Sequence, residues 1–314
     1  MLRVTRRATE LIAILLCSMI VEAGRSAAIT AQFPSFRSGV DVVAVSVTVT
    51  DVAGRYIGDL GREHFQIFED GRPQHVTFFQ PRQLPLALAL LIDTSASMEP
   101  HLRVAQDAAA GFVRALGPAD LAAVVDFDTG VRVGQEFTTD RGALERAIRS
   151  TTALGATALY NAVYIALKEL NKTVRGEIAT EPRRRAMVIL SDGEDNSSLM
   201  TFDEVLDAAT RSDTAIYAIG LFGPQTTVTL KSGEPQYVLR KLAEQTGGRA
   251  FFIADAKELH GVYEAIRAEL SNQYVLAYES SNTRRDGQFR RVTVRVDCPN
   301  TVTRARPGYF AGSR

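Results

Sequence analysis

A continuous apolar run at residues 84–93, LPLALALLID, constrains the fold of this chain more than any other segment. Its length and its lack of alternation are typical of a strand that is buried on both faces of a sheet. Further strand-like runs follow at residues 121–128, 185–192 and 215–222, with amphipathic helical patterns between them. Strands that alternate with helices indicate a doubly wound, mostly parallel sheet with helices on both faces.

The helices and the shorter strands of this α/β pattern follow from apolar spacing and from glycine or proline stop signals. We predict helices at residues 102–116, 140–150, 157–170, 202–211, 237–248 and 259–270. We also predict short strands at residues 131–138 and 249–254, the second of them at an edge of the sheet.

The segments that flank the α/β pattern have strand character only. Residues 40–51 alternate with period two, and in residues 64–80 two apolar segments surround Asp70 and Gly71, a pair that favours a tight hairpin turn. We predict further strands at residues 272–280, 289–297 and 306–310. Because neither flank can bury a core alone, we predict one small all-β sandwich-like domain formed from both chain ends. Two separate β extensions that pack on the α/β domain are the alternative.

The N-terminus has the pattern of an export signal. Arg3, Arg6 and Arg7 precede the apolar segment LIAILLCSMIV, and small-residue cleavage sites follow it. A transmembrane helix needs about 20 apolar residues, so an uncleaved membrane anchor is only the alternative. We therefore expect an exported protein, periplasmic or secreted.

These patterns divide the chain into four segments. We expect a signal peptide at residues 1–31, an N-terminal β segment at 32–83, the α/β domain at 84–270, and a C-terminal β segment at 271–314 that packs with residues 40–82. The 36 basic and 36 acidic residues cancel, so the composition suggests neither nucleic acid nor an anionic membrane as a partner. Without the signal only Cys298 remains, and a lone thiol forms no internal disulfide.

Carboxylates and hydroxyls gather where the predicted strands of the α/β domain end. Asp93 ends the strand at residues 84–93, and Ser95 and Ser97 follow it directly. Asp192 ends the strand at residues 185–192, and Thr157 lies in a loop that opens a helix. Because ligands bind at the carboxyl ends of the strands in an open α/β sheet, we expect these five side chains to meet at one edge.

A catalytic serine or aspartate explains this pattern poorly. The histidines of the chain are His64, His75, His101 and His260. None lies in the loops of Thr157 and Asp192, so a serine nucleophile lacks its usual base. A phosphatase-type aspartyl nucleophile at Asp93 lacks its acid/base partner, because Ser95 stands two residues later. Zinc-ligand spacing and a glycine-rich phosphate loop are also missing from the sequence.

A metal site fits the same residues better. Hydroxyl and carboxylate oxygens are hard ligands that suit Mg²⁺, with Mn²⁺ or Ca²⁺ as alternatives. Hydroxyl ligands do not neutralise a divalent cation, so the remaining charge favours an acidic side chain from a partner protein. The structural alternative is helix capping by Thr94 or Ser97, with Asp192 in an Asx turn.

The segments DTSASM, GATALYNAV and LSDGEDN resemble the three parts of the metal-ion-dependent adhesion site (MIDAS) of von Willebrand factor type A domains. The resemblance covers residues 84–270 and implies a Rossmann-like fold. It also implies that Ser95, Ser97 and Thr157 are hydroxyl ligands and that Asp93 and Asp192 bind mainly through water. The flanking segments FEDGRPQHVTFF and ARPGYF resemble those of bacterial exported proteins with a related domain.

We therefore expect a non-enzymatic, metal-dependent protein-binding or cell-adhesion module that acts outside the cytoplasm. Two alternatives stay open: a Mg²⁺-dependent hydrolase with Asp192 or Glu194 as its base, and a scaffold whose metal is purely structural. Around the site, Glu194, Asp195 and Asn196 either border the metal or are solvated loop residues. For Asp126 we expect a structural turn role rather than an outer-shell one.

Overall fold

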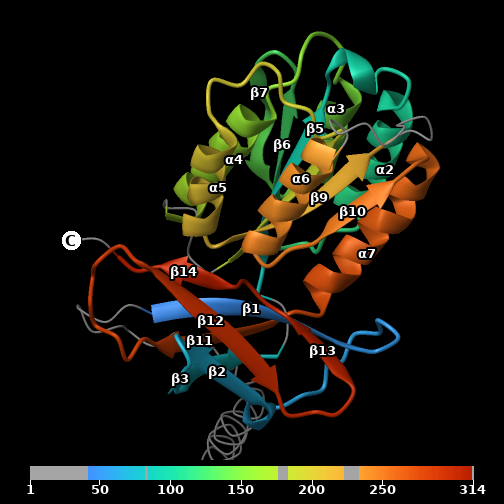
Figure 1. Cartoon of the computed structure of the whole chain (residues 1–314). Coiled ribbons are helices and arrows are strands. Elements are labelled where there is room, and N and C mark those ends of the chain that lie inside the picture. Colours follow the sequence, from blue (N-terminus) through green and yellow to red (C-terminus); the bar gives the residue numbers. More distant parts are fainter. Residues whose placement is uncertain (1–41, 82–83, 176–182, 223–232, 313–314) are drawn as a thin grey trace, which may run out of the picture. The chain divides into compact units, whose positions relative to one another are not determined.

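A six-stranded sheet forms the centre of the α/β part, in the order β10-β9-β8-β5-β6-β7 (Figure 1). Its strands are β5 (Leu86–Asp93), β6 (Leu121–Phe127), β7 (Val131–Thr138), β8 (Arg184–Ser191), β9 (Thr214–Leu221) and β10 (Ala250–Ile253). All neighbouring strands are parallel except β6 and β7, which pair antiparallel. Every residue of β5 is buried, as its unbroken apolar sequence predicts.

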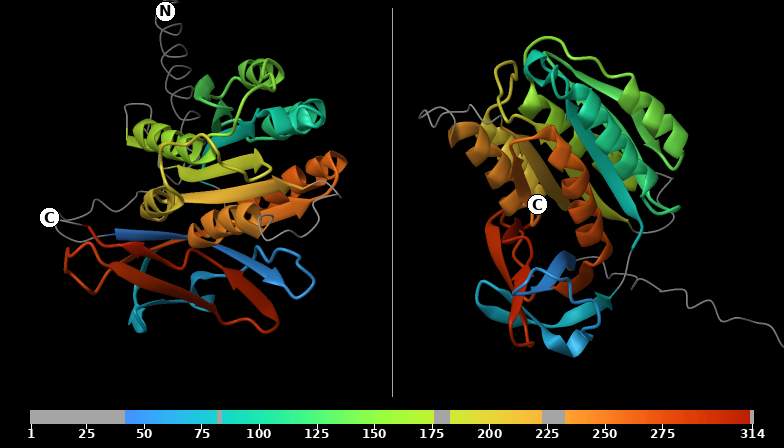
Figure 2. Two further views of the ribbon diagram at one scale, coloured as in Figure 1. Left: turned by 45° about the horizontal axis from the view of Figure 1, so that its top comes forward. Right: turned by 90° about the vertical axis from the view of Figure 1, so that its right-hand side faces the viewer.

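Helices cover both faces of this sheet (Figures 1 and 2). One layer contains α2 (Leu102–Arg114), α3 (Arg141–Arg149) and α7 (Leu259–Ser271), and the other contains α4 (Leu159–Arg175), α5 (Phe202–Arg211) and α6 (Gly233–Gln245). Successive β5 side chains alternate between the two cores, with Leu88 and Leu90 on the α2 side and Ala89 and Leu91 on the α4 side. The predicted doubly wound α/β fold is confirmed.

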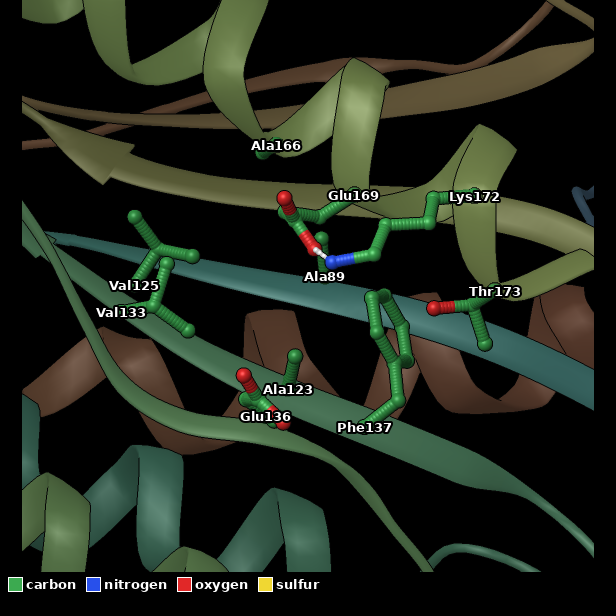
Figure 3. Close-up of a pocket in the computed structure, with 10 residues that line it drawn as sticks. All are labelled: Ala89, Ala123, Val125, Val133, Glu136, Phe137, Ala166, Glu169, Lys172 and Thr173. Carbon is green, nitrogen blue, oxygen red and sulfur yellow. Dashed lines mark hydrogen bonds and ion pairs between the residues drawn. The ribbon is translucent and has the colours of Figure 1, made fainter. Parts of the chain in front are cut away.

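Small side chains on the α4 side leave a cavity of about 220 Å³ between α4 and the strands β6 and β7. Ala89, Ala123 and Ala166 line it and fill little of the space. Figure 3 shows Glu169 and Lys172 reaching toward each other at one side, with a 3.5 Å ion pair between Glu169 Oε2 and Lys172 Nζ.

Both ends of the chain build a β-sandwich of two four-stranded sheets, ordered β13-β1-β11-β4 and β14-β12-β2-β3. The strands are β1 (Val42–Asp51), β2 (Phe65–Glu69), β3 (Arg72–Gln74), β4 (Val76–Gln80), β11 (Tyr274–Glu279), β12 (Phe289–Val296), β13 (Thr301–Arg304) and β14 (Gly308–Phe310). β1 pairs with β11 and β2 with β12, so each sheet contains strands from both chain ends. The two sheets share one core, which confirms the predicted sandwich.

The Asp-Gly hairpin forms where the sequence predicts it, but its second arm is short. Asp70 and Gly71 have φ of 47° and 80°, the left-handed values that a tight hairpin turn requires. The second arm, β3, ends at Gln74, and the next strand, β4, pairs with β11 in the other sheet. Pro73 lies within β3, which is the edge strand of its sheet, the place where a residue without an N–H is tolerated.

A buried ion pair lies inside the sandwich. The side chains of Glu69 and Arg290 are both 2% exposed, and Arg290 NH1 lies 3.5 Å from Glu69 Oε1. The hydroxyls of Tyr278, Ser280 and Tyr309 donate hydrogen bonds of 2.8, 2.7 and 2.9 Å to the same carboxylate. Burial, together with the neighbouring carboxylate, raises the pKa of Tyr278, which keeps its hydroxyl a donor.

Glu269 of α7 connects the α/β part to the sandwich. Its carboxylate accepts hydrogen bonds from Tyr217 of β9 at 2.8 Å and from Thr48 of β1 at 3.4 Å. It also forms an ion pair with Arg304 of β13. These bonds join both parts within the unit Gly39–Arg314.

The structure describes residues 42–81, 84–175, 183–222 and 233–312. The expected signal peptide at residues 1–31 lies outside these ranges. Within them, no helix is long and apolar enough to cross a membrane.

Candidate metal-ion site

The loops that follow β5 and β8 meet at the carboxyl edge of the sheet. Asp93 is the last residue of β5, and Asp192 directly follows β8, the parallel neighbour of β5. Ser97 Oγ donates a 2.6 Å hydrogen bond to Asp192 Oδ2, and Ser95 Oγ lies 3.0 Å from Ser97 Oγ. Four of the five residues that the sequence singles out therefore share one small region.

The loop that carries Thr157 runs beside the first of these loops. Leu154 N–H donates to Thr94 O at 2.8 Å, and Ala96 N–H donates to Gly155 O at 3.1 Å. These two bonds fix the loop against the chain that links Asp93 to the serines. Gly155 has φ of 81°, and a Cβ at this position would lie 2.5 Å from Thr129 Oγ1, so the turn requires glycine.

On its other side, Thr157 contacts the loop that follows β8. Its carbonyl oxygen accepts hydrogen bonds from the backbone N–H groups of Asn196 and Ser197, both at 3.0 Å. Thr157 is 3% exposed, and its hydroxyl makes no hydrogen bond to any other part of the described chain. The structure thus places the fifth residue between the loops of the other four.

The spacing of the hydroxyls suits an octahedral cation. With Mg²⁺–oxygen distances of about 2.1 Å, neighbouring ligands of an octahedron lie about 3.0 Å apart. Ser95 Oγ and Ser97 Oγ form a hydrogen bond of 3.0 Å, and this separation is compatible with such an edge. Among the described residues, no three His, Cys, Asp or Glu side chains group together as a metal site. Any cation here would therefore depend on hydroxyl ligands, with Asp93 and Asp192 as the accompanying carboxylates.

Asp93 is fully buried, and its environment shifts its titration. Ser95 N–H donates to Asp93 Oδ1 at 2.9 Å, and Ser191 Oγ donates to Asp93 Oδ2 at 2.5 Å. Burial raises the pKa of Asp93 from 3.8 to about 6, although both hydrogen bonds act in the opposite direction. A cation beside the carboxylate would favour its ionised form.

Ser191 is a functional candidate that the sequence reasoning missed. Besides donating to Asp93, its hydroxyl accepts a 2.9 Å hydrogen bond from Gly193 N–H. The signal was a hydroxyl at the end of an otherwise apolar buried strand. Gly193 has φ of 79°, and a Cβ there would lie 2.9 Å from Pro235 O, so this turn also requires glycine.

Side chains from the loop after β8 cap the N-terminus of α4. The N–H groups of Thr157, Tyr160 and Asn161 donate to Asn196 Oδ1 at 2.8 Å, Asp195 Oδ2 at 2.8 Å and Ser198 Oγ at 3.1 Å. In the first turn of α4, the N–H groups of Tyr160 and Asn161 have no partner within the helix, so the loop satisfies them from outside. Asp195 and Asn196 therefore brace the Thr157 loop, whereas Glu194 is exposed.

Asp126 has the structural role that the sequence favours. Arg132, its antiparallel partner on β7, donates from Nε to Asp126 Oδ2 at 2.8 Å and from NH1 to Asp128 Oδ2 at 2.9 Å. These ion pairs close the hairpin between β6 and β7.

A parallel sheet between two helix layers, with oxygen side chains at its carboxyl edge, defines a class of ligand-binding α/β domain. Residues 88–194 match the family model of the von Willebrand factor type A domain. Domains of this family commonly mediate protein–protein interactions. Comparison with curated proteins found no match.

Solved structures include similar folds at low sequence identity. A von Willebrand factor type A protein from Catenulispora acidiphila is 14% identical, with 89% of this chain and 76% of that chain covered and a TM-score of 0.50. An aerotolerance-related membrane protein from Bacteroides fragilis is 15% identical, with 59% of this chain and 98% of that chain covered and a TM-score of 0.47. Proximal thread matrix protein 1 from the mussel byssus, with a zinc-occupied MIDAS motif, is 13% identical (59% and 48% covered, TM-score 0.49). The first of these supports the fold.

Proposed function

We propose that this protein is an exported, divalent-metal-dependent protein-binding module. Ser95, Ser97 and Thr157 would hold the cation directly, while Asp93 and Asp192 would hold it mainly through water. The observation that carries the proposal is the pair of serine hydroxyls 3.0 Å apart, one of them bonded to Asp192.

The charge of this ligand set supports a protein ligand with an acidic side chain. A bound Mg²⁺ would supply a positive charge that three neutral hydroxyls leave uncompensated. The two carboxylates would lie one shell further out, and Asp93 is fully buried. A carboxylate from a partner would complete the ligand set and would be attracted across the edge of the sheet.

The surroundings of the site favour binding over hydrolysis. A hydrolase would need a base beside the reacting water. Asp192 accepts hydrogen bonds from Ser97 Oγ and from Glu194 N–H, so its carboxylate is engaged in holding the loops. Leu154 and Leu199 are 72% and 95% exposed on the neighbouring loops, and such side chains suit contact with another protein.

Metal titration of the EDTA-treated protein tests the proposal. At a free Mg²⁺ concentration of about 100 times Kd, binding stabilises the fold by about 2.7 kcal/mol. For a protein of this size we expect a rise in Tm of about 4–5 °C. Asp93→Ala and Ser97→Ala should lose the shift, and Mn²⁺ and Ca²⁺ should be compared in parallel.

Ser212→Ala is the matched control, because this serine donates a 2.7 Å hydrogen bond to Ala209 O at the end of α5. It should keep the metal response. A wild-type protein without any metal-dependent change in Tm would refute the proposal. A phosphatase and esterase screen with added Mg²⁺ tests the hydrolase alternative. Metal-dependent stability without a metal-dependent partner would support a purely structural metal.

Export is the second half of the proposal and rests on residues 1–31. Expression of the full chain in a bacterial host, followed by fractionation and N-terminal sequencing, tests it. A mature protein that begins between residues 24 and 32 and lies outside the cytoplasm is the expected result. A cytoplasmic protein that keeps its first residues would contradict it.

A further inference from the structure

Two strongly exposed leucines flank the candidate metal site. Leu154 is 72% exposed and Leu199 is 95% exposed. Single exposed apolar residues are common on protein surfaces, so exposure alone says little. What needs an explanation is that both lie on the loops that contain or contact the proposed ligands.

Leu154 is held in place by the ligand loop itself. Its N–H donates to Thr94 O at 2.8 Å, and Thr94 stands between Asp93 and Ser95. Thr157 follows three residues later, a stretch of at most about 10 Å of chain. The leucine is therefore exposed on a backbone that hydrogen bonds fix beside the site.

Leu199 is anchored on the other side of Thr157. Ser197 N–H donates to Thr157 O at 3.0 Å, and Ser197 Oγ donates to Thr129 O at 3.2 Å. Ser198 Oγ accepts from the first turn of α4. Leu199 follows within at most about 7 Å of chain from Ser197. The two leucines thus lie on the two loops that enclose Thr157.

The loops that carry Ser97 and Asp192 each have an exposed acidic side chain. These side chains are Glu99 and Glu194. Arg132, whose partners lie at the end of β6, is already paired with Asp126 and Asp128. Without a cation this face would repel an acidic ligand, and with a cation its centre becomes attractive while the leucines offer apolar contact.

We propose that the partner of this face is a protein segment that presents one carboxylate flanked by apolar side chains, which Leu154 and Leu199 contact. This inference rests on the proposed function, because the carboxylate requires the cation. The leucines then determine which acidic segments bind. Loss of either leucine contact should weaken binding about tenfold, since each buries a large apolar side chain.

Selection from a displayed peptide library tests the inference. The library carries a central Asp, with Ala and Asn as substitutes, and randomised residues on both sides. It is selected on the immobilised protein in Mg²⁺ and, in parallel, in EDTA. We expect enrichment of Asp at the centre and of Leu, Ile, Val or Phe beside it, in Mg²⁺ only.

Leu154→Ser and Leu199→Ser should keep the central Asp but lose the apolar flanks. Val52→Ser, at another strongly exposed apolar position (78%) on the sandwich, should behave like the wild type. Selected peptides should bind the leucine variants about tenfold more weakly.

The outcomes separate the two proposals. Enrichment of Asp without apolar flanks, or apolar flanks that persist in both leucine variants, overturns the role of the leucines and leaves the proposed function standing. Failure to enrich Asp in Mg²⁺ overturns both. Metal-dependent self-association that either leucine variant abolishes would assign this face to a second copy of the chain and would also overturn the inference.

Discussion

The Ser191 hydroxyl donates a 2.5 Å hydrogen bond to the buried carboxylate of Asp93, and this bond joins the ends of two neighbouring parallel strands. Ser95 N–H holds the second oxygen of the same carboxylate. Asp93 is therefore oriented from both sides before any ligand arrives. Such second contacts orient the groups of a metal site and commonly tune its affinity.

Ser191→Ala should weaken Mg²⁺ binding about 10- to 100-fold. The substitution leaves one oxygen of a buried carboxylate without its donor, which should also cost about 1–3 kcal/mol of unfolding free energy. Isothermal titration calorimetry measures the affinity, and chemical denaturation without metal measures the stability. Ser212→Ala should lower stability without lowering affinity. Equal Mg²⁺ affinity in Ser191→Ala and wild type would contradict the positioning role.

The raised pKa of Asp93 predicts a specific pH dependence in the metal-free protein. The pKa of Asp93 is about 6 in the folded protein and 3.8 ordinarily. Its favourable contribution to the free energy of unfolding is therefore complete below pH 3.8 and is lost as pH rises through about 6. Asp93→Asn mimics the protonated side chain. Relative to this variant, metal-free wild type should lose up to about 3 kcal/mol between pH 4 and pH 8.

Thermal unfolding of both proteins in EDTA across this pH range checks the prediction. Groups other than Asp93 titrate alike in the two proteins, so the difference in Tm isolates the carboxylate. Excess Mg²⁺ should stabilise the wild type alone at pH 8, because the cation favours the ionised form. A difference in Tm that does not change with pH would show that the pKa of Asp93 lies outside this pH range.

Asp195→Ala should loosen the start of α4. Its carboxylate accepts from Tyr160 N–H and from both the N–H and the hydroxyl of Ser198, so its loss removes a cap worth about 1 kcal/mol. We also expect faster hydrogen exchange at the Thr157 loop and weaker metal binding. Asp203→Ala, in the first turn of α5, is the control and should leave both unchanged. Unaltered exchange at Thr157 in Asp195→Ala would rule out the bracing role.

Much of the fold could be predicted because its signals are local. The apolar run at residues 86–93 is a buried strand since both of its faces meet helices, and Asp70-Gly71 turns because glycine accepts a positive φ. Strand β13 was missed: Thr301–Arg304 is short and follows a turn at Asn300. It forms because it pairs with the edge of β1, a tertiary contact that the local sequence does not reveal.

The candidate site was likewise predictable from the sequence only in part. Motif spacing brought Asp93, Thr157 and Asp192 to the same edge, because parallel strands deliver their carboxyl ends together. The residues that support the site, such as Asp195, could not be identified from the sequence. The sequence leaves open whether Asp195 borders the metal or is a solvated loop residue. Its role as a cap for α4 depends on a contact with Tyr160 from a distant part of the sequence.

The buried pair Glu69–Arg290 should be essential for the sandwich. Glu69→Ala leaves Arg290 charged, buried and without its partner, which should cost about 3–5 kcal/mol. The double variant Glu69→Leu/Arg290→Met removes both charges and should be less destabilised than the single variant. Guanidinium denaturation of all three proteins measures this difference. A cost below about 1 kcal/mol for Glu69→Ala would contradict the prediction. Because the pair lies in the sandwich, Mg²⁺ affinity of the folded Glu69→Ala protein should equal that of the wild type.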